Sequence, residues 1–148
     1  MTASDSTIEI RRILWVGPVT VAVAIIAVLV VRVIAFSALN LSPEFVPLRW
    51  SALIVFTAVL VSAAVLVFAA VSRWTVNPVR FYRRLAFGVL VASMIPDLLL
   101  PGSGPGATWP SAVVLMVMHV AAWWPTVSIL TRWTVRQDTK QPDSNHAG

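Results

Sequence analysis

The sequence predicts an all-α membrane protein whose four transmembrane helices pack as a compact antiparallel bundle. Of the 148 residues, 58% are hydrophobic and only 11% are charged, and the mean hydropathy is +0.84. The apolar residues fall into four blocks, each near the roughly 20 helical residues needed to cross a hydrocarbon core of about 30 Å. This composition argues against a soluble, disordered or nucleic-acid-binding protein, because the basic residues that produce the net charge of +5 lie at the edges of the apolar blocks. The predicted spans cover residues 13–34, 51–71, 80–100 and 111–130.

The first two predicted spans are the most apolar. The first follows Arg11-Arg12 and contains a Gly17-Pro18 pair, which should bend the helix because proline removes a backbone donor. Its apolar run of about 20 residues exceeds the roughly 7 to 15 of a signal-peptide core, which favours a retained span over a cleaved leader. The second span lies between tryptophans 24 residues apart, about 36 Å at 1.5 Å per residue. Tryptophans at that spacing are typical of a span with one ring in each membrane interface.

The third predicted helix differs from the others in its polar start. Asn77 is expected as its N-cap and Pro78 as its first helical residue. Arg80, Arg83 and Arg84 follow, so the apolar part is only 16 residues long, from 85 to 100. A Pro/Gly-rich loop at 101–106 then leads to the fourth span. Residues 1–136 form one transmembrane domain in this interpretation, and 137–148 form a disordered cytoplasmic tail.

The distribution of positive charge predicts the orientation. Nine Arg and Lys residues fall on the side that holds both termini and the connection between the second and third spans. Arg32 and Arg49 fall on the other side, so the positive-inside rule places both termini in the cytoplasm. Ten arginines to one lysine, beside abundant Ala and Val, are typical of a GC-rich genome and indicate a bacterial cell membrane. Five tryptophans are expected in the two interfaces: Trp15, Trp50, Trp74, Trp109 and Trp133.

The chain contains an internal similarity. The pattern from Ser-Ala to Ser-Arg-Trp-Thr-Val at 51–76 reappears as Ser-Ala to Thr-Arg-Trp-Thr-Val at 111–135, and the double arginine before the first span is matched by one before the third. Two repeated helical hairpins, related by a pseudo-twofold axis along the membrane normal, would produce this pattern. Convergence is the alternative, because any cytoplasmic interface favours arginine beside tryptophan.

Three ionisable residues lie within the apolar blocks, and intramembrane ionisable groups indicate a functional site by default. Asp97 is 13 residues beyond Arg84, and His119 is 13 residues before Arg132, so each lies about 20 Å from the cytoplasmic interface. We expect the two at one height on neighbouring antiparallel helices, where they could share a proton or hydrogen bond. Arg32, the third, should reach the outer interface and could dip towards Asp97.

Helical spacing predicts a small polar pocket around this pair. Ser93 lies on the face of Asp97, and the pocket wall on the face of His119 is expected to include Met116, Trp123 and Thr126. Structural alternatives remain open for each ionisable group. Asp97 would be a helix-end residue near the headgroups, His119 a packing contact between helices, and Arg32 a snorkelling anchor.

The sequence offers little support for a cofactor or metal. It contains no cysteine and only two histidines, one of them near the C-terminus, so no metal site and no cofactor are expected. The Arg83-Arg84 pair, the run Ser93-Met94-Ile95-Pro96 and the Met118-His119 pair resemble a family of uncharacterised small four-span membrane proteins of GC-rich bacteria, a domain of unknown function. That resemblance implies a fold and a membrane location but no activity.

Three classes of function remain. The leading interpretation is a non-enzymatic membrane protein, either an accessory subunit or a bundle that binds a small ligand. The alternatives are a membrane enzyme that uses Asp97 and His119 on a lipophilic substrate, or a small proton-coupled transporter that acts as an oligomer. Expected partners are the lipid bilayer and either a second copy or another membrane protein, and not nucleic acid. A cavity at the level of the pair would favour a ligand-binding function, whereas close packing would favour a structural one.

Overall fold

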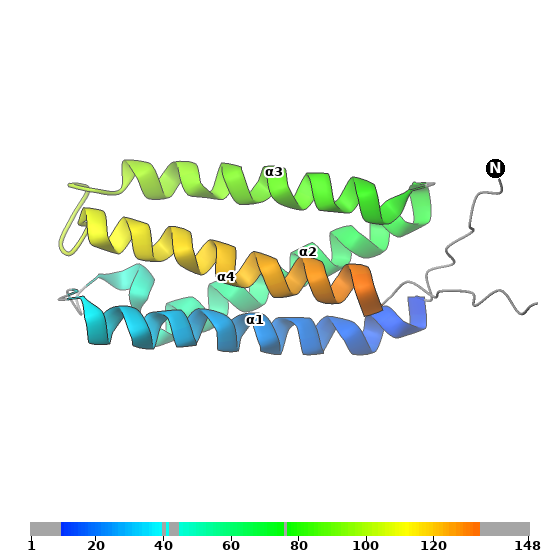
Figure 1. Cartoon of the computed structure of the whole chain (residues 1–148), viewed down its shortest axis with the longest axis horizontal. Helices are drawn as coiled ribbons and strands as arrows, with labels where there is room; N and C mark the ends of the chain where they lie inside the picture. The colour runs from blue at the N-terminus through cyan, green and yellow to red at the C-terminus, as the bar shows by residue number, and fades with distance from the viewer. Residues whose placement is uncertain (1–9, 40, 42–44, 76, 134–148) are drawn as a thin grey trace, which may run out of the picture.

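The structure is a computed structural model that describes residues 10–39, 41, 45–75 and 77–133, with side-chain environments from residue 14 onward. The described chain contains four α-helices and one short 3₁₀ helix: α1 (Ile10–Ala38), η1 (Val46–Leu48), α2 (Trp50–Trp74), α3 (Pro78–Leu99) and α4 (Trp109–Trp133). Each helix runs antiparallel to the next, so α1 begins and α4 ends at the same end of the bundle (Figure 1). The expected tail at 137–148 lies outside the described residues.

Three of the helices are long and apolar enough to cross a membrane: Leu14–Ala38, Trp50–Trp74 and Trp109–Trp133. The expectation of four such spans is therefore met by three helices and not by α3. Its 22 residues form a helix as long as a span, but the arginines of its first turns and Asp97 near its end leave too short an apolar stretch. Much of its outer surface is nevertheless apolar and exposed, through Phe81, Phe87, Val89, Val91, Ile95, Leu98 and Leu99.

The start of α3 and the loop that follows it have local causes in the sequence. The N-cap of α3 is Asn77 and its first residue is Pro78, as predicted, although the Asn77 side chain makes no capping hydrogen bond. In the loop between α3 and α4, Gly102 and Gly106 have φ angles of +84° and +74°, a conformation that side chains with a Cβ rarely adopt. The amide of Gly102 donates to the carbonyl of Ala107 over 2.9 Å and closes the loop on itself.

The helices pack unequally. Helix α4 lies between α1 and α3, while α2 crosses the bundle at a steep angle (Figure 1). Helix α1 packs along most of α4 and of α2, whereas α2 contacts α3 much more sparsely. At Gly17 the backbone of α1 comes so close to α2 that an added Cβ would lie 3.2 Å from Cγ1 of Val65. The bundle is thus closed around α1 and open between α2 and α3.

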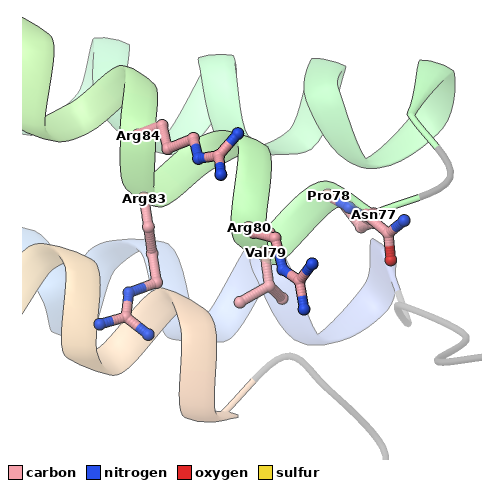
Figure 2. A pocket seen from close by; sticks show the side chains of 6 residues that line it. All are labelled: Asn77, Pro78, Val79, Arg80, Arg83 and Arg84. Atoms are coloured by element: carbon pink, nitrogen blue, oxygen red, sulfur yellow. The ribbon is translucent and has the colours of Figure 1, made fainter.

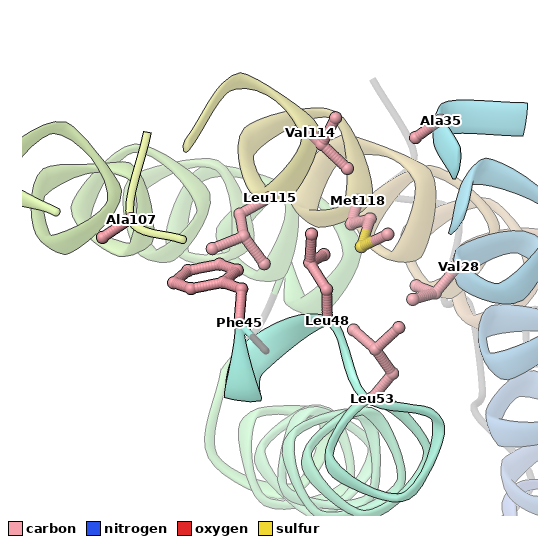
Figure 3. Packing of buried hydrophobic residues seen from close by; sticks show 9 residues of the cluster. All are labelled: Val28, Ala35, Phe45, Leu48, Leu53, Ala107, Val114, Leu115 and Met118. Carbon is pink, nitrogen blue, oxygen red and sulfur yellow. The ribbon is translucent and has the colours of Figure 1, made fainter. Parts of the chain in front are cut away.

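A hydrophobic wedge from the α1–α2 connection explains this opening. The cluster contains Phe45 and Leu48 from η1 and its approach, Leu53 from α2, and Leu115 and Met118 from α4. Figure 3 shows Phe45 and Leu48 pointing from the connection towards α4 and filling the space between α4 and the first turns of α2. This wedge, which the sequence did not predict, lies between the first turns of α2 and α4.

A second cluster closes the opposite end, where α2 and α3 meet. It joins α1, α2, α3 and α4 through Val16, Phe68, Tyr82, Val127 and Leu130. The rings of Phe68 and Tyr82 pack edge to face, with centroids 4.8 Å apart. Helices α2 and α3 therefore form a V that is joined at this cluster and separated at the wedge.

Aromatic residues mark both ends of the bundle. Trp50 and Trp109 are the first residues of α2 and α4, and Trp74 and Trp133 are the last. All four are exposed, as is Trp15 near the start of α1. Amphipathic rings on the outside of a bundle at both ends are typical of a protein anchored in two membrane interfaces.

Candidate functional site

A cavity of about 710 Å³ occupies the V between α2 and α3, with α4 as its floor. Its wall is almost entirely apolar. Phe56 and Leu60 from α2 and Val89 from α3 line it and are also more than half exposed. The cavity therefore opens onto the outer surface of the bundle between these two helices. Its volume lies within the roughly 300 to 1,000 Å³ of small-molecule sites.

The two ionisable residues that the sequence placed at one height meet in this cavity. Nδ1 of His119 lies 3.1 Å from Oδ2 of Asp97, and both residues line the cavity wall. The side chain of Asp97 is 10% exposed and that of His119 is 31% exposed. A carboxyl group and an imidazole so close together offset part of each other's desolvation cost in an apolar environment.

The hydrogen bonds of the imidazole fix the position of its proton. Nδ1 of His119 also lies 2.9 Å from the carbonyl oxygen of Leu115, one turn earlier on α4. A carbonyl oxygen can only accept, so Nδ1 carries the hydrogen and donates it to Leu115. The 3.1 Å approach to Asp97 is consequently an electrostatic contact and not a second well-aligned hydrogen bond, and Oδ2 of Asp97 is left without a hydrogen-bond partner. Nε2 of His119 has no partner among the described residues, and in the neutral ring whose Nδ1 carries the hydrogen it is the acceptor.

Two further buried polar atoms around the cavity lack partners. The hydroxyl oxygen of Tyr82 and Nε1 of Trp123 make no hydrogen bond within the described part of the chain, and both residues line the cavity. Buried polar groups are almost always hydrogen-bonded, to protein or to water, and each exception requires an explanation. Here all three unpaired side-chain atoms belong to residues that line one cavity.

Only some of the other residues predicted for the pocket line the cavity. Ser93, Trp123 and Thr126 line the cavity, whereas Met116 does not, and its place is taken by Leu115. The hydroxyl of Ser93 donates to the carbonyl of Leu90, and that of Thr126 donates to a carbonyl one turn earlier on α4. These two hydroxyls are therefore satisfied within their own helices and do not contact the imidazole.

Arg32 lies elsewhere. Its Nε donates to the carbonyl of Leu48 over 2.7 Å, and its guanidinium lies 4.3 and 4.1 Å from the ring centroids of Phe36 and Trp50. It does not line the cavity. Arg32 thus holds the wedge of the α1–α2 connection in place, and the suggested approach to Asp97 is not found.

A second hollow, of about 430 Å³, lies at the start of α3 and is lined by arginines (Figure 2). Arg80, Arg83 and Arg84 surround it beside Asn77 and the first helical turn. Among the described residues none of these arginines forms an ion pair with a carboxylate. A cluster of arginines of this kind suits anionic groups such as phosphate.

No group of three metal-binding side chains occurs in the described ranges. The Asp97–His119 contact provides two ligand groups, fewer than the three protein ligands that catalytic zinc sites use.

Sequence reasoning missed the whole α2 side of the cavity and the role of Tyr82. The α2 wall is apolar and includes Ala52, Ala63 and Ala64, which offer no polar marker for a site. Small residues on a span indicate close helix packing as readily as an open wall. Tyr82 lies two residues after Arg80 and gave no signal of burial, although it is only 2% exposed.

Comparisons with known proteins identify a family for the chain. No curated protein and no solved structure matches the chain. One family of unknown function, DUF6069, matches residues 8–134, which is most of the sequence. The chain therefore belongs to the DUF6069 family.

Proposed function

We propose that this protein binds a lipophilic small molecule within the membrane, in the cavity between α2, α3 and α4. One observation carries the proposal: an apolar cavity of about 710 Å³ opens between two helices and contains an ionisable pair. A bundle with only a structural role would gain stability by closing such a space, since voids forfeit packing contacts. An aspartate and a histidine in the cavity wall add a desolvation cost, which apolar residues would avoid if the wall were only structural.

In this proposal, α3 lies in the hydrocarbon layer of the membrane beside the three candidate spans. Helix α3 carries the chain from the end where α2 stops to the end where α4 begins (Figure 1). Its exposed side chains between Leu85 and Leu99 are largely apolar, as expected of a surface that faces lipid. Its Arg80, Arg83 and Arg84 would then lie among the headgroups at one end, where arginine side chains are tolerated.

The arginines favour an orientation for the bundle. In the described residues Arg73, Arg80, Arg83, Arg84 and Arg132 lie at one end of the bundle, and Arg32 and Arg49 at the other. The positive-inside rule assigns the first end to the cytoplasm. Because α1 begins and α4 ends there, both termini would be cytoplasmic in the cell membrane.

A membrane enzyme that acts on a lipophilic substrate is the second candidate. The free Nε2 of His119 beside an apolar chamber favours it, because such a nitrogen can act as a general base. The described chain supplies no nucleophile beside it, since the Ser93 hydroxyl is bonded to Leu90. Binding without chemistry accounts for the observed contacts with fewer assumptions.

Saturable photolabelling tests the binding proposal. The protein in phosphatidylcholine nanodiscs would be irradiated with hexadecanol that carries a diazirine in its chain, and the labelled peptides identified by mass spectrometry. We expect labelling to concentrate on cavity-lining residues of α2 and α3, to saturate, and to fall when unmodified hexadecanol is added in excess.

Two substitutions on α3 provide a matched comparison. Ala86→Phe places a ring in the cavity, whereas Val91→Phe places the same ring at an exposed position of the same helix that does not line the cavity. The first should abolish saturable labelling and the second should leave it unchanged. Labelling that is uniform over the exposed apolar surface, does not saturate and is equal in both variants would refute the proposal.

A further inference from the structure

The unpaired polar atoms around the cavity define the head group of the ligand, an inference that rests on the proposed binding function. Near the wedge end, Nε2 of His119 has no partner in the described chain, and it is an acceptor in the neutral tautomer whose Nδ1 donates to Leu115. Trp123 follows His119 by four residues, so it lies about 6 Å further along the same face of α4. Its Nε1 is a buried donor without a partner in the described chain. The cavity thus presents an acceptor and a donor one helical turn apart.

A hydroxyl group satisfies both atoms at once. Its hydrogen can be donated to Nε2 of His119, while its oxygen accepts from Nε1 of Trp123. A ketone or an ether oxygen can only accept, and would leave the neutral imidazole unpaired. A carboxylate would bring a second acidic group towards Asp97, whose Oδ2 already has no hydrogen-bond donor in the described chain. Two negative charges close together repel strongly in an apolar environment.

The remainder of the cavity fits a hydrocarbon chain. Apart from the Asp97–His119 region, the lining consists mostly of Ala, Val, Leu and Phe side chains from α2 and α3. The opening between these helices faces the side of the bundle, so a ligand can enter from the lipid layer. We propose that the ligand is a lipid alcohol, with a long apolar chain along the V and a neutral hydroxyl head between His119 and Trp123.

The hydroxyl of Tyr82, which also has no partner in the described chain, lies too far away to bind the same head group. Tyr82 precedes Asp97 by 15 residues on α3, which is about 22 Å along the helix. Its hydroxyl could contact only a distal part of a long ligand. The head-group assignment therefore depends on His119 and Trp123 and leaves Tyr82 aside.

Competition by matched compounds tests this assignment. Hexadecanol, its methyl ether and hexadecanoic acid would compete with the diazirine hexadecanol in wild-type nanodiscs. The ether keeps the accepting oxygen and loses the donated hydrogen, so the alcohol should compete about fivefold more strongly, as expected for one net hydrogen bond. The acid should be the weakest competitor at a pH at which its head is ionised.

Two variants assign the two hydrogen bonds separately. His119→Phe should remove the preference for alcohol over ether, because it removes the acceptor of the donated hydrogen and keeps the donor on Trp123. Trp123→Phe should weaken both competitors by about fivefold and keep the preference, since both offer an oxygen to the lost donor. It also provides an independent test if His119→Phe fails to fold.

The outcomes distinguish this inference from the proposed function. Equal competition by alcohol and ether in the wild type would overturn the head-group assignment, while saturable labelling would still support the cavity as a binding site. A preference that survives in His119→Phe would also overturn the assignment. Absence of any saturable labelling would contradict both proposals.

Discussion

Replacement of Tyr82 by phenylalanine should stabilise the ligand-free protein. Tyr82 is 2% exposed, and its hydroxyl has no hydrogen-bond partner in the described structure. A buried polar group without a partner costs about 1 to 3 kcal/mol. Tyr82→Phe removes that group and keeps the edge-to-face contact with Phe68. Because loss of the oxygen also leaves a small void, we expect the free energy of unfolding to rise by about 1 kcal/mol.

Equilibrium unfolding in mixed micelles, with the mole fraction of dodecyl sulfate as denaturant, measures this change. Tyr82→Ala is the comparison variant, because it removes the ring and should cost about 3 to 5 kcal/mol. If Tyr82→Phe instead lowers the free energy of unfolding by 1 kcal/mol or more, the hydroxyl has a partner in the folded protein. That result would refute the argument that the cavity wall carries unpaired polar atoms.

Three further substitutions test the packing that shapes the cavity, each by the same unfolding measurement. Gly88→Ala should stabilise α3 by about 0.5 to 1 kcal/mol, because alanine favours the helix and its Cβ would meet nothing within 4 Å. A lower free energy of unfolding would contradict this. Gly17→Leu should cost about 1 to 3 kcal/mol, because the Cβ alone would lie 3.2 Å from Val65, and an unchanged stability would show that α1 and α2 can separate freely. Arg32→Met should cost about 2 kcal/mol through loss of the hydrogen bond to Leu48 and of two ring contacts, while a neutral effect would show that the arginine does not hold the connection.

Local chemistry predicted the helices and the polar pair well. Asn77 and Pro78 specify the start of α3 because the cap and the first helical position need those residue types. The contact between Asp97 and His119 follows from counting, since equal distances from an interfacial arginine place them at one height on neighbouring helices. Their functional role is a proposal that the labelling experiments address.

The parts that sequence could not predict depend on how whole helices are rotated and tilted. Met116 and Leu115 lie three and four residues before His119, and a modest rotation of α4 decides which of them faces the cavity. The steep crossing of α2 follows from the wedge of Phe45 and Leu48, which contact residues far away in the sequence. Helix α3 has the length of a span, but its arginines lower its hydropathy, so it is not among the candidate spans.

The α1–α2 and α3–α4 hairpins pack differently, although a repeat would make their packing equivalent. If α1–α2 and α3–α4 are repeated units, a pseudo-twofold axis relates the α1–α4 interface to the α2–α3 interface. The first is extensive and the second is sparse, so the symmetry is broken at the cavity. The two connections supply a physical reason. The α1–α2 connection inserts Phe45 and Leu48 under α4, whereas the α3–α4 loop closes on itself through Gly102. Only the first connection pushes its following helix outward, and the space that results is the one lined by Asp97 and His119.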